Sequence, residues 1–254
     1  MRAPSRLMLA GAAALALMVQ MPLASATELK ISGAAAVAGG VINPHKAAIE
    51  QETGLTLNVI ANGDANGLKD LNAGKIDAMM VAAPLNATAA TINKATPNAV
   101  TTDGIEFAPI GATMIHFVVN PANSVKTLTA AQVKDIFTGK VTNWKEVGGA
   151  DQPIVVIAEV PGLGTRTNVV AGALGGEDIT PNARTMQALV QVAQVVGQVP
   201  NAIGYGNAAS ITGAVAVISG IAVKQPLGFA TKGAPNADVQ KLIAVSSKFA
   251  AAVN

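Results

Sequence analysis

The chain has 254 residues and a formal net charge of +2, with no cysteine and two histidines. The lack of cysteine excludes disulfides and thiolate chemistry, and His45 and His116 do not form a metal-spaced pair. No basic run or aromatic cluster supports nucleic-acid binding. There is also no serine–histidine–acid signature and no Walker loop. The sequence therefore predicts a protein that is not an enzyme, needs no cofactor or metal and binds no nucleic acid.

The first 26 residues have the pattern of a secretory signal peptide. Arg2 and Arg6 precede an apolar core of thirteen residues, 7–19, and Ala24-Ser25-Ala26 has the small-residue cleavage pattern. Thirteen residues are too few to span a bilayer, and no cysteine follows that could carry a lipid anchor. We therefore expect cleavage after Ala26. The released protein would have 228 residues and equal numbers of acidic and basic side chains.

Downstream of the signal peptide, apolar runs of strand length alternate with helical patterns. Runs typical of strands occupy residues 28–32, 55–60, 76–82, 105–110, 114–119, 154–158 and 202–206. Predicted helices occupy residues 41–53, 88–95, 130–138, 182–196 and 238–253, with a short helix that ends near Gly74 and another that begins near Arg166. This alternation favours βαβ units and an α/β fold with a mostly parallel sheet.

The segment from residue 120 to residue 170 carries the most local information. Thr129 and Gln132 have capping-box spacing at the start of a helix, and Gly139 follows its last apolar residue. Strand 154–158 leads into the glycine-containing loop 159–165, which opens the next helix. In open α/β sheets, ligands bind at this junction between the carboxyl end of a strand and a helix start.

Three motifs of this segment resemble a known family. They are Asn120-Pro121-Ala122-Asn123-Ser124-Val125, the run from Ile136 through Asn143-Trp144 to Gly149, and Gly162-Leu163-Gly164-Thr165-Arg166. Together they are similar to the phosphate-binding proteins of bacterial ABC transporters, a group of two-lobed periplasmic solute-binding proteins. The resemblance implies the type II periplasmic-binding-protein fold, in which each lobe is a mixed, mostly parallel sheet flanked by helices. It also implies a periplasmic monomer that binds a small molecule and delivers it to a membrane ABC permease.

The same resemblance implies a discontinuous division of the chain. One lobe would hold residues 27–115 and 206–254, and the other would be an insertion of residues 116–205. The chain would cross between the lobes near residues 115–120 and 202–206.

Four loops are expected at the cleft between the lobes: 33–38, 63–67, 81–84 and 159–166. The resemblance places ligand contacts there at Ala35, Ala36, Val37, Asp64, Ala82, Glu159, Gly162, Leu163, Gly164, Thr165 and Arg166. Gly162, Gly164, Thr165 and Arg166 match the family pattern.

The other positions depart from the family in one chemical direction. The serines or threonines of the family's first loop are here Ala35, Ala36 and Val37, and its serine–aspartate pair falls on Val81 and Ala82. The serine of its glycine loop is here Leu163, a serine of its second loop falls on Asp64, and its arginine falls on Glu159. A carboxylate about 4 Å from a phosphate charge would cost roughly 4 kcal/mol at an effective dielectric near 20. We therefore expect a ligand other than free phosphate. A small organic molecule that bears an amine or several hydroxyl groups suits an apolar cleft with carboxylates.

Two other functions stay open from the sequence. Backbone N–H groups and Thr165 could bind phosphate or another oxyanion, or the cleft could be degenerate and the protein an interaction or sensory partner.

Individual residues also have structural interpretations. Thr165 could cap a helix, Glu159 could pair with Arg166, and Asp64 could stabilise a turn. Trp144 is expected to anchor packing, and Met79 and Met80 are expected in the core.

Overall fold

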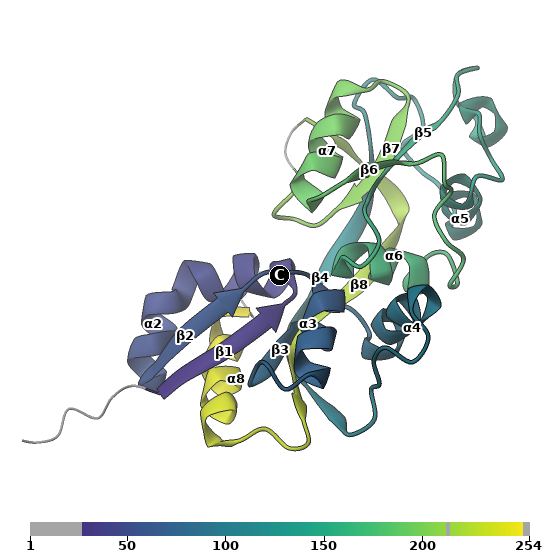
Figure 1. Cartoon of the computed structure of the whole chain (residues 1–254). Coiled ribbons are helices and arrows are strands. Elements are labelled where there is room, and N and C mark those ends of the chain that lie inside the picture. The colour runs from purple at the N-terminus through teal and green to yellow at the C-terminus, as the bar shows by residue number, and fades with distance from the viewer. Residues whose placement is uncertain (1–26, 212–213, 251–254) are drawn as a thin grey trace, which may run out of the picture.

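The computed structural model describes residues 27–211 and 214–250, and these form two lobes (Figure 1). The predicted signal peptide lies outside the described residues. Within the described part, no helix is both long and apolar enough to cross a membrane.

The first lobe is built mainly from the N-terminal part of the chain and closed by the last helix. Its elements up to the first crossing are β1 (Thr27–Gly33), α1 (Ala35–Val37), a π-helical turn (Ala38–Ile42), α2 (Asn43–Thr53), β2 (Leu55–Ile60), α3 (Asp64–Asn72), β3 (Ala78–Val81) and α4 (Leu85–Ala95). The last helix is α8 (Ala237–Ala250), which packs beside α2.

The second lobe lies between two long strands, β4 (Ile105–Val119) and β8 (Ala216–Lys232). Its own elements are α5 (Ala130–Thr138), a 3₁₀ turn (Trp144–Val147), β5 (Val155–Glu159), α6 (Gly164–Gly172), β6 (Arg184–Met186), α7 (Leu189–Gln198) and β7 (Ala202–Gly206). The predicted capping box of Thr129 and Gln132 is confirmed at α5, and Gly139 ends that helix with a φ of 84°.

All eight strands share one mixed sheet with the order β2-β1-β3-β8-β4-β7-β5-β6. Strands β4 and β8 pair antiparallel from Ile105–Lys232 at one end to Val119–Ala216 at the other, and they run from one lobe into the other (Figure 1). The prediction of a second crossing at residues 202–206 is therefore wrong. That segment is β7, which pairs with β4 and β5 inside the second lobe.

Separate hydrophobic clusters stabilise the two lobes. In the first lobe, side chains of β1 and β3 pack with α2, α8 and the β8 residues Leu227 and Phe229. In the second lobe, Phe117, Phe137 and Tyr205 pack in one cluster with Ile218 and Val223 of β8. Trp144 is buried in this second cluster, and Met79 and Met80 are fully buried in the first lobe, as predicted for all three.

The first helical segment is longer than the sequence pattern indicates. The prediction of a helix from residue 41 is wrong at its start, because helical backbone begins at Ala35 and passes through the π-helical turn into α2. Pro44 lies in the first turn of α2 and has no N–H to donate to the preceding turn. A wider π turn accommodates such a missing hydrogen bond. It carries Gly39 and Gly40 to the edge of the inter-lobe cavity.

The region 182–196, predicted as one helix, also differs. Residues Arg184–Met186 form β6 beside β5, and α7 begins only at Leu189. The side chain of Gln191 accepts hydrogen bonds from the backbone N–H groups of Gln187 and Ala188 at the start of α7. This turn positions residues 187–190 at the cavity.

Candidate ligand-binding site

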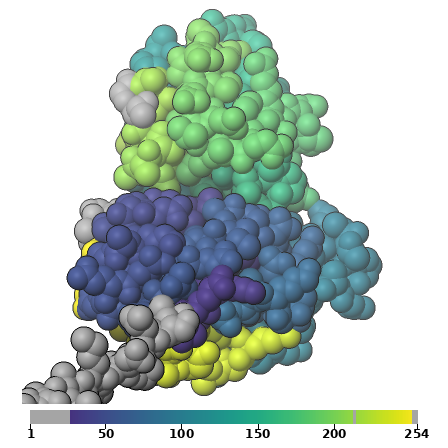
Figure 2. All heavy atoms as spheres, turned by 60° about the vertical axis from the view of Figure 1, so that its left-hand side comes forward, coloured from purple at the N-terminus to yellow at the C-terminus, as the bar shows by residue number. Residues whose placement is uncertain are grey.

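A cavity of about 460 Å³ lies where the two lobes meet, a size typical of small-molecule sites. The lobes are in direct contact in the space-filling view (Figure 2). The lining residues come from both lobes: Ala35, Ala36, Gly39, Gly40, Gly63, Asp64, Ala82, Thr113, Glu159, Leu163, Gly164, Thr165, Gln187, Ala188, Leu189, Val190, Asn207, Ala208, Ala209, Ser210, Gln225 and Leu227.

Eight of the eleven predicted site residues line this cavity. Three do not. Val37 points into the core of the first lobe and is fully buried there, and neither Gly162 nor Arg166 belongs to the lining. The loop that contains Gly162 still shapes the site, because its carbonyl oxygen accepts a hydrogen bond of 3.3 Å from the Ala65 N–H of the first lobe.

Asp64 is a buried carboxylate that the protein itself satisfies. It is the first residue of α3, its side chain is 1% exposed, and Oδ1 accepts a hydrogen bond of 2.8 Å from the Ala82 N–H. Burial raises the pKa of Asp64 to about 6, while the backbone N–H groups of Ala82, Ala83 and Asp64 itself lower it. The interpretation of Asp64 as a mere turn residue is therefore wrong.

Asp64 also sets how closely the two lobes approach each other. A Cβ built on Gly164 would lie 2.2 Å from Asp64 Oδ2, so a side chain at position 164 would collide with the carboxylate. Glycine at position 164 therefore lets α6 of the second lobe approach the start of α3 in the first lobe. Asn168 of α6, in the second lobe, also donates a hydrogen bond to the Ala82 carbonyl oxygen of the first lobe.

Glu159 is a buried carboxylate without a side-chain partner. It is the last residue of β5, its side chain is 4% exposed, and Oε2 has no hydrogen-bond partner. Burial raises the pKa of Glu159 to about 7, and the charge of Asp64 adds to the rise. The backbone N–H and the charge of Arg166 lower it but do not offset burial.

Arg166 does not pair with the Glu159 carboxylate, so that interpretation is wrong. Its Nη1 donates a hydrogen bond of 2.8 Å to the backbone oxygen of Glu159, and none of the ion pairs among the described residues includes Glu159. Tyr205 fixes the peptide group on the other side of Glu159, because its hydroxyl oxygen accepts the Glu159 N–H at 2.9 Å. The backbone of Glu159 is thus anchored on both sides, and its carboxylate faces the cavity uncompensated.

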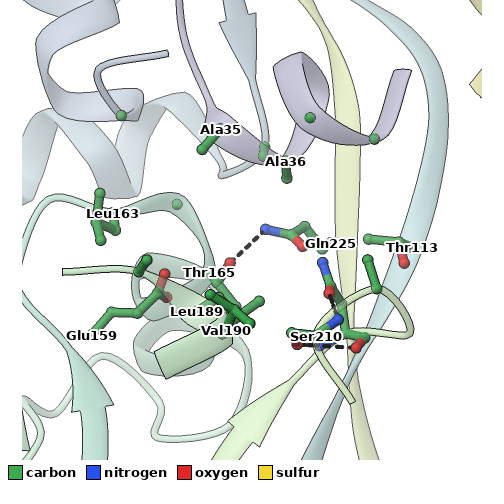
Figure 3. A pocket seen from close by; sticks show the side chains of 18 of the residues that line it. Ala35, Ala36, Thr113, Glu159, Leu163, Thr165, Leu189, Val190, Ser210 and Gln225 are labelled. Carbon is green, nitrogen blue, oxygen red and sulfur yellow. Dashed lines mark hydrogen bonds between the residues drawn. The ribbon is translucent and has the colours of Figure 1, made fainter. Parts of the chain in front are cut away.

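Thr165 and Gln225 form a polar contact next to Glu159. Gln225 Nε2 donates a hydrogen bond of 3.3 Å to Thr165 Oγ1, and Gln225 Oε1 is buried without a partner. In the close-up, Glu159, Thr165 and Gln225 face Ala35 and Ala36 across the cavity (Figure 3). The capping interpretation of Thr165 is wrong, because Leu163 occupies the N-cap of α6 and no side chain caps that helix.

Several lining residues could not be found from local motifs. The sequence motifs leave out Gln225 of β8 and Thr113 of β4. They also leave out residues 187–190 at the start of α7 and the loop residues 207–210. Gln225 did carry one signal, since it is a lone amide in the run Ile221–Leu227, which is otherwise largely apolar.

The lining leaves the cavity with an acidic and apolar character. Among the lining residues described, none is lysine, arginine or histidine, and many are alanine, leucine or valine. Among the described residues there is also no group of three or more side chains suited to hold a metal ion. The polar groups of the lining are the carboxyl groups of Asp64 and Glu159 and the hydroxyl and amide groups of Thr113, Thr165, Gln187, Asn207, Ser210 and Gln225. Among them, Glu159 Oε2 and Gln225 Oε1 are buried without a hydrogen-bond partner.

Two lobes joined by two long strands, with a cavity between them, define the class of two-lobed solute-binding folds of type II. Residues 22–245 match the family model described as a PBP superfamily domain, and the chain belongs to this family.

Individual relatives agree with this assignment. The phosphate-binding protein PstS of Bacillus subtilis (strain 168) is 29% identical over 182 residues, which are 70% of this chain and 56% of that protein. An ABC-type phosphate transport receptor from Vibrio cholerae superposes with a TM-score of 0.69 at 22% identity, over 87% of this chain and 93% of its own.

Two further structures show how widely the fold is used. A putative phosphate ABC transporter substrate-binding protein with bound phosphate from Clostridium perfringens gives a TM-score of 0.68 at 24% identity, over 88% of this chain and 92% of its own. A sulfate-bound OxyR2 E204G mutant regulatory domain from Vibrio vulnificus gives a TM-score of 0.58 at 17% identity, over 90% of this chain and 99% of its own. These likenesses establish the fold.

Proposed function

We propose that this protein is an exported solute-binding protein that captures a small molecule other than free phosphate between its lobes. The observation that carries the proposal is the buried Glu159 carboxylate in the cavity, together with Asp64 opposite it. The closure of the lobes around one cavity supports a receptor that encloses its solute.

The charge balance of the cavity is the reason to exclude phosphate, although the relatives are named for it. An enclosed phosphate loses its water and needs several charge-assisted hydrogen bonds in return. Thr165 and the N–H groups at the start of α6 are available, but a helix start contributes only about 0.3–2 kcal/mol. Two buried carboxylates oppose these contributions, and Arg166 is committed to a backbone oxygen.

The lobes would close by a hinge in β4 and β8, the two strands that connect them. We divide the chain accordingly, with residues up to about 110 and the end of β8 onward in the first lobe. Residues 216–223 then belong to the second lobe, because Ile218 and Val223 pack in its core. The partner that receives the solute would be a membrane permease of the ABC type, and the site of action would be the periplasm.

A thermal-shift screen against a broad library of small solutes tests this proposal. We expect at least one solute to raise the melting temperature of the mature protein, residues 27–254, by several degrees, because a solute that binds only the folded state stabilises it. If no solute of the library raises the melting temperature, the receptor function is wrong and the protein is an interaction partner with a degenerate cleft.

A further inference from the structure

Some buried polar atoms of the cavity have a hydrogen-bond partner within the protein, and others do not. The Asp64 carboxylate already accepts the Ala82 N–H, whereas Glu159 Oε2 and Gln225 Oε1 are buried and have no partner. Gln225 Oε1 is an acceptor, and Glu159 Oε2 becomes one when the carboxyl ionises; buried acceptors are costly unless a donor reaches them. The missing group is therefore a hydrogen-bond donor.

The charge of that donor follows from the groups that face Glu159. They are Asp64 on α3, Arg166 on α6 and Tyr205 on β7. Glu159 Oε2 has no hydrogen-bond partner, and none of the ion pairs among the described residues includes Glu159, so its ionised carboxylate lacks a cation that pairs with it. Burial is the main reason that its pKa is raised. A hydroxyl group would supply a donor but no charge, whereas an ammonium group supplies both.

The remaining lining decides what the donor is attached to. Ala35, Ala36, Leu189, Val190 and Leu227 present hydrocarbon to the cavity. A negative charge on the solute would find no lysine, arginine or histidine among the described lining residues, and a carboxylate would be repelled by Asp64 and Glu159.

Building on the proposed function, we infer that the solute is a small aliphatic primary amine, whose ammonium group pairs with the Glu159 carboxylate and whose hydrocarbon part contacts the apolar lining. Thr165 holds the Gln225 side chain in place through its hydroxyl oxygen.

Matched probes test the inference on the mature protein. Straight-chain primary amines of three to six carbons are compared with the alcohols and carboxylates of equal length, by thermal shift and then by titration calorimetry at pH 8. At least one amine is expected to bind, and its alcohol and carboxylate are not. Equal binding of the matching alcohol, or no binding by any amine, overturns the inference.

Two further measurements assign the contact to Glu159. Glu159→Gln is expected to weaken amine binding about 10- to 100-fold, the usual effect of losing a charged hydrogen-bond partner. Glu106→Gln, an exposed matched control on β4, should leave it unchanged. In the unaltered protein at pH 6, calorimetry in two buffers should show release of close to one proton per amine bound, because Glu159 must ionise. The absence of proton release contradicts the assignment even where Glu159→Gln fails to fold.

The outcomes separate the two proposals. If another solute of the broad library stabilises the protein and no amine does, the amine inference fails and the receptor function stands. If nothing stabilises it, both fail.

Discussion

Glu159 and Asp64 should make the stability of the empty protein fall as the pH rises. Their pKa values are raised from 4.5 to about 7 and from 3.8 to about 6, so between these values the folded state binds more protons than the unfolded state. The free energy of unfolding is therefore highest below pH 4, where both groups are protonated, and it decreases as the pH rises through 6 to 7. The slope reaches about 1.4 kcal/mol per pH unit for one group.

Melting curves from pH 5 to 8 check this expectation. Glu159→Gln should gain stability relative to the unaltered protein across this range, and Glu106→Gln should follow the unaltered protein. A constant difference between Glu159→Gln and the unaltered protein at all pH values would show that Glu159 titrates normally.

Reversing the charge in the cavity should bring phosphate binding to this site. Glu159→Arg combined with Leu163→Ser removes an anion, adds a cation and restores a hydroxyl at the N-cap of α6. Phosphate should then raise the melting temperature of the double variant by a few degrees and leave the unaltered protein unchanged. A double variant that folds and ignores phosphate would show that the cavity excludes phosphate by shape.

At the scale of elements, the contact between α3 and α6 depends on the absence of a side chain at Gly164. Gly164→Ala places a Cβ against Asp64 and should cost on the order of 1–3 kcal/mol of unfolding free energy. The cost should shrink when Asp64→Ala is also present, which a double-mutant cycle measures. Gly39→Ala is the control, since a Cβ there meets no atom within 4 Å. Additive effects of the two substitutions would contradict the contact.

Elements with strong local signals could be predicted from the sequence. The capping box at Thr129, the strand 55–60 and the packing role of Trp144 depend on neighbouring residues or on plain apolarity, and all three agree with the structure. The loop 159–166 could be placed at the cleft because strand and helix signals flank it.

The missed elements depend on contacts between distant segments. Strand β8 contains Gly220, Pro226 and Gly228, which locally indicate turns, and it is held by pairing with β4 on both sides of a bulge at residues 218–221. Gln225 lies on this strand, so it was missed together with β8. Strand β6 is only three residues long and forms because β5 lies beside it. Local patterns carry no information on such pairing, which is why more than half of the residues that line the cavity could not be predicted.

For the whole molecule, the long strands β4 and β8 predict a hinge. The polar contacts across the cleft include two hydrogen bonds, Asn168 to Ala82 and Ala65 to Gly162, and the exposed ion pair of Lys94 with Asp178, which contributes little. A bound solute should therefore shift the protein toward the closed form and decrease its radius of gyration in small-angle scattering. An unchanged radius with a saturating solute from the library would contradict hinge closure.

The central claim is that this cleft has lost the charge balance that phosphate needs, and calorimetric titration of the mature protein with inorganic phosphate at pH 7.5 tests it most directly. At this pH Glu159 is largely ionised, because its pKa is about 7. We predict no measurable binding up to millimolar phosphate. A dissociation constant in the micromolar range or tighter would contradict the claim and establish a phosphate receptor.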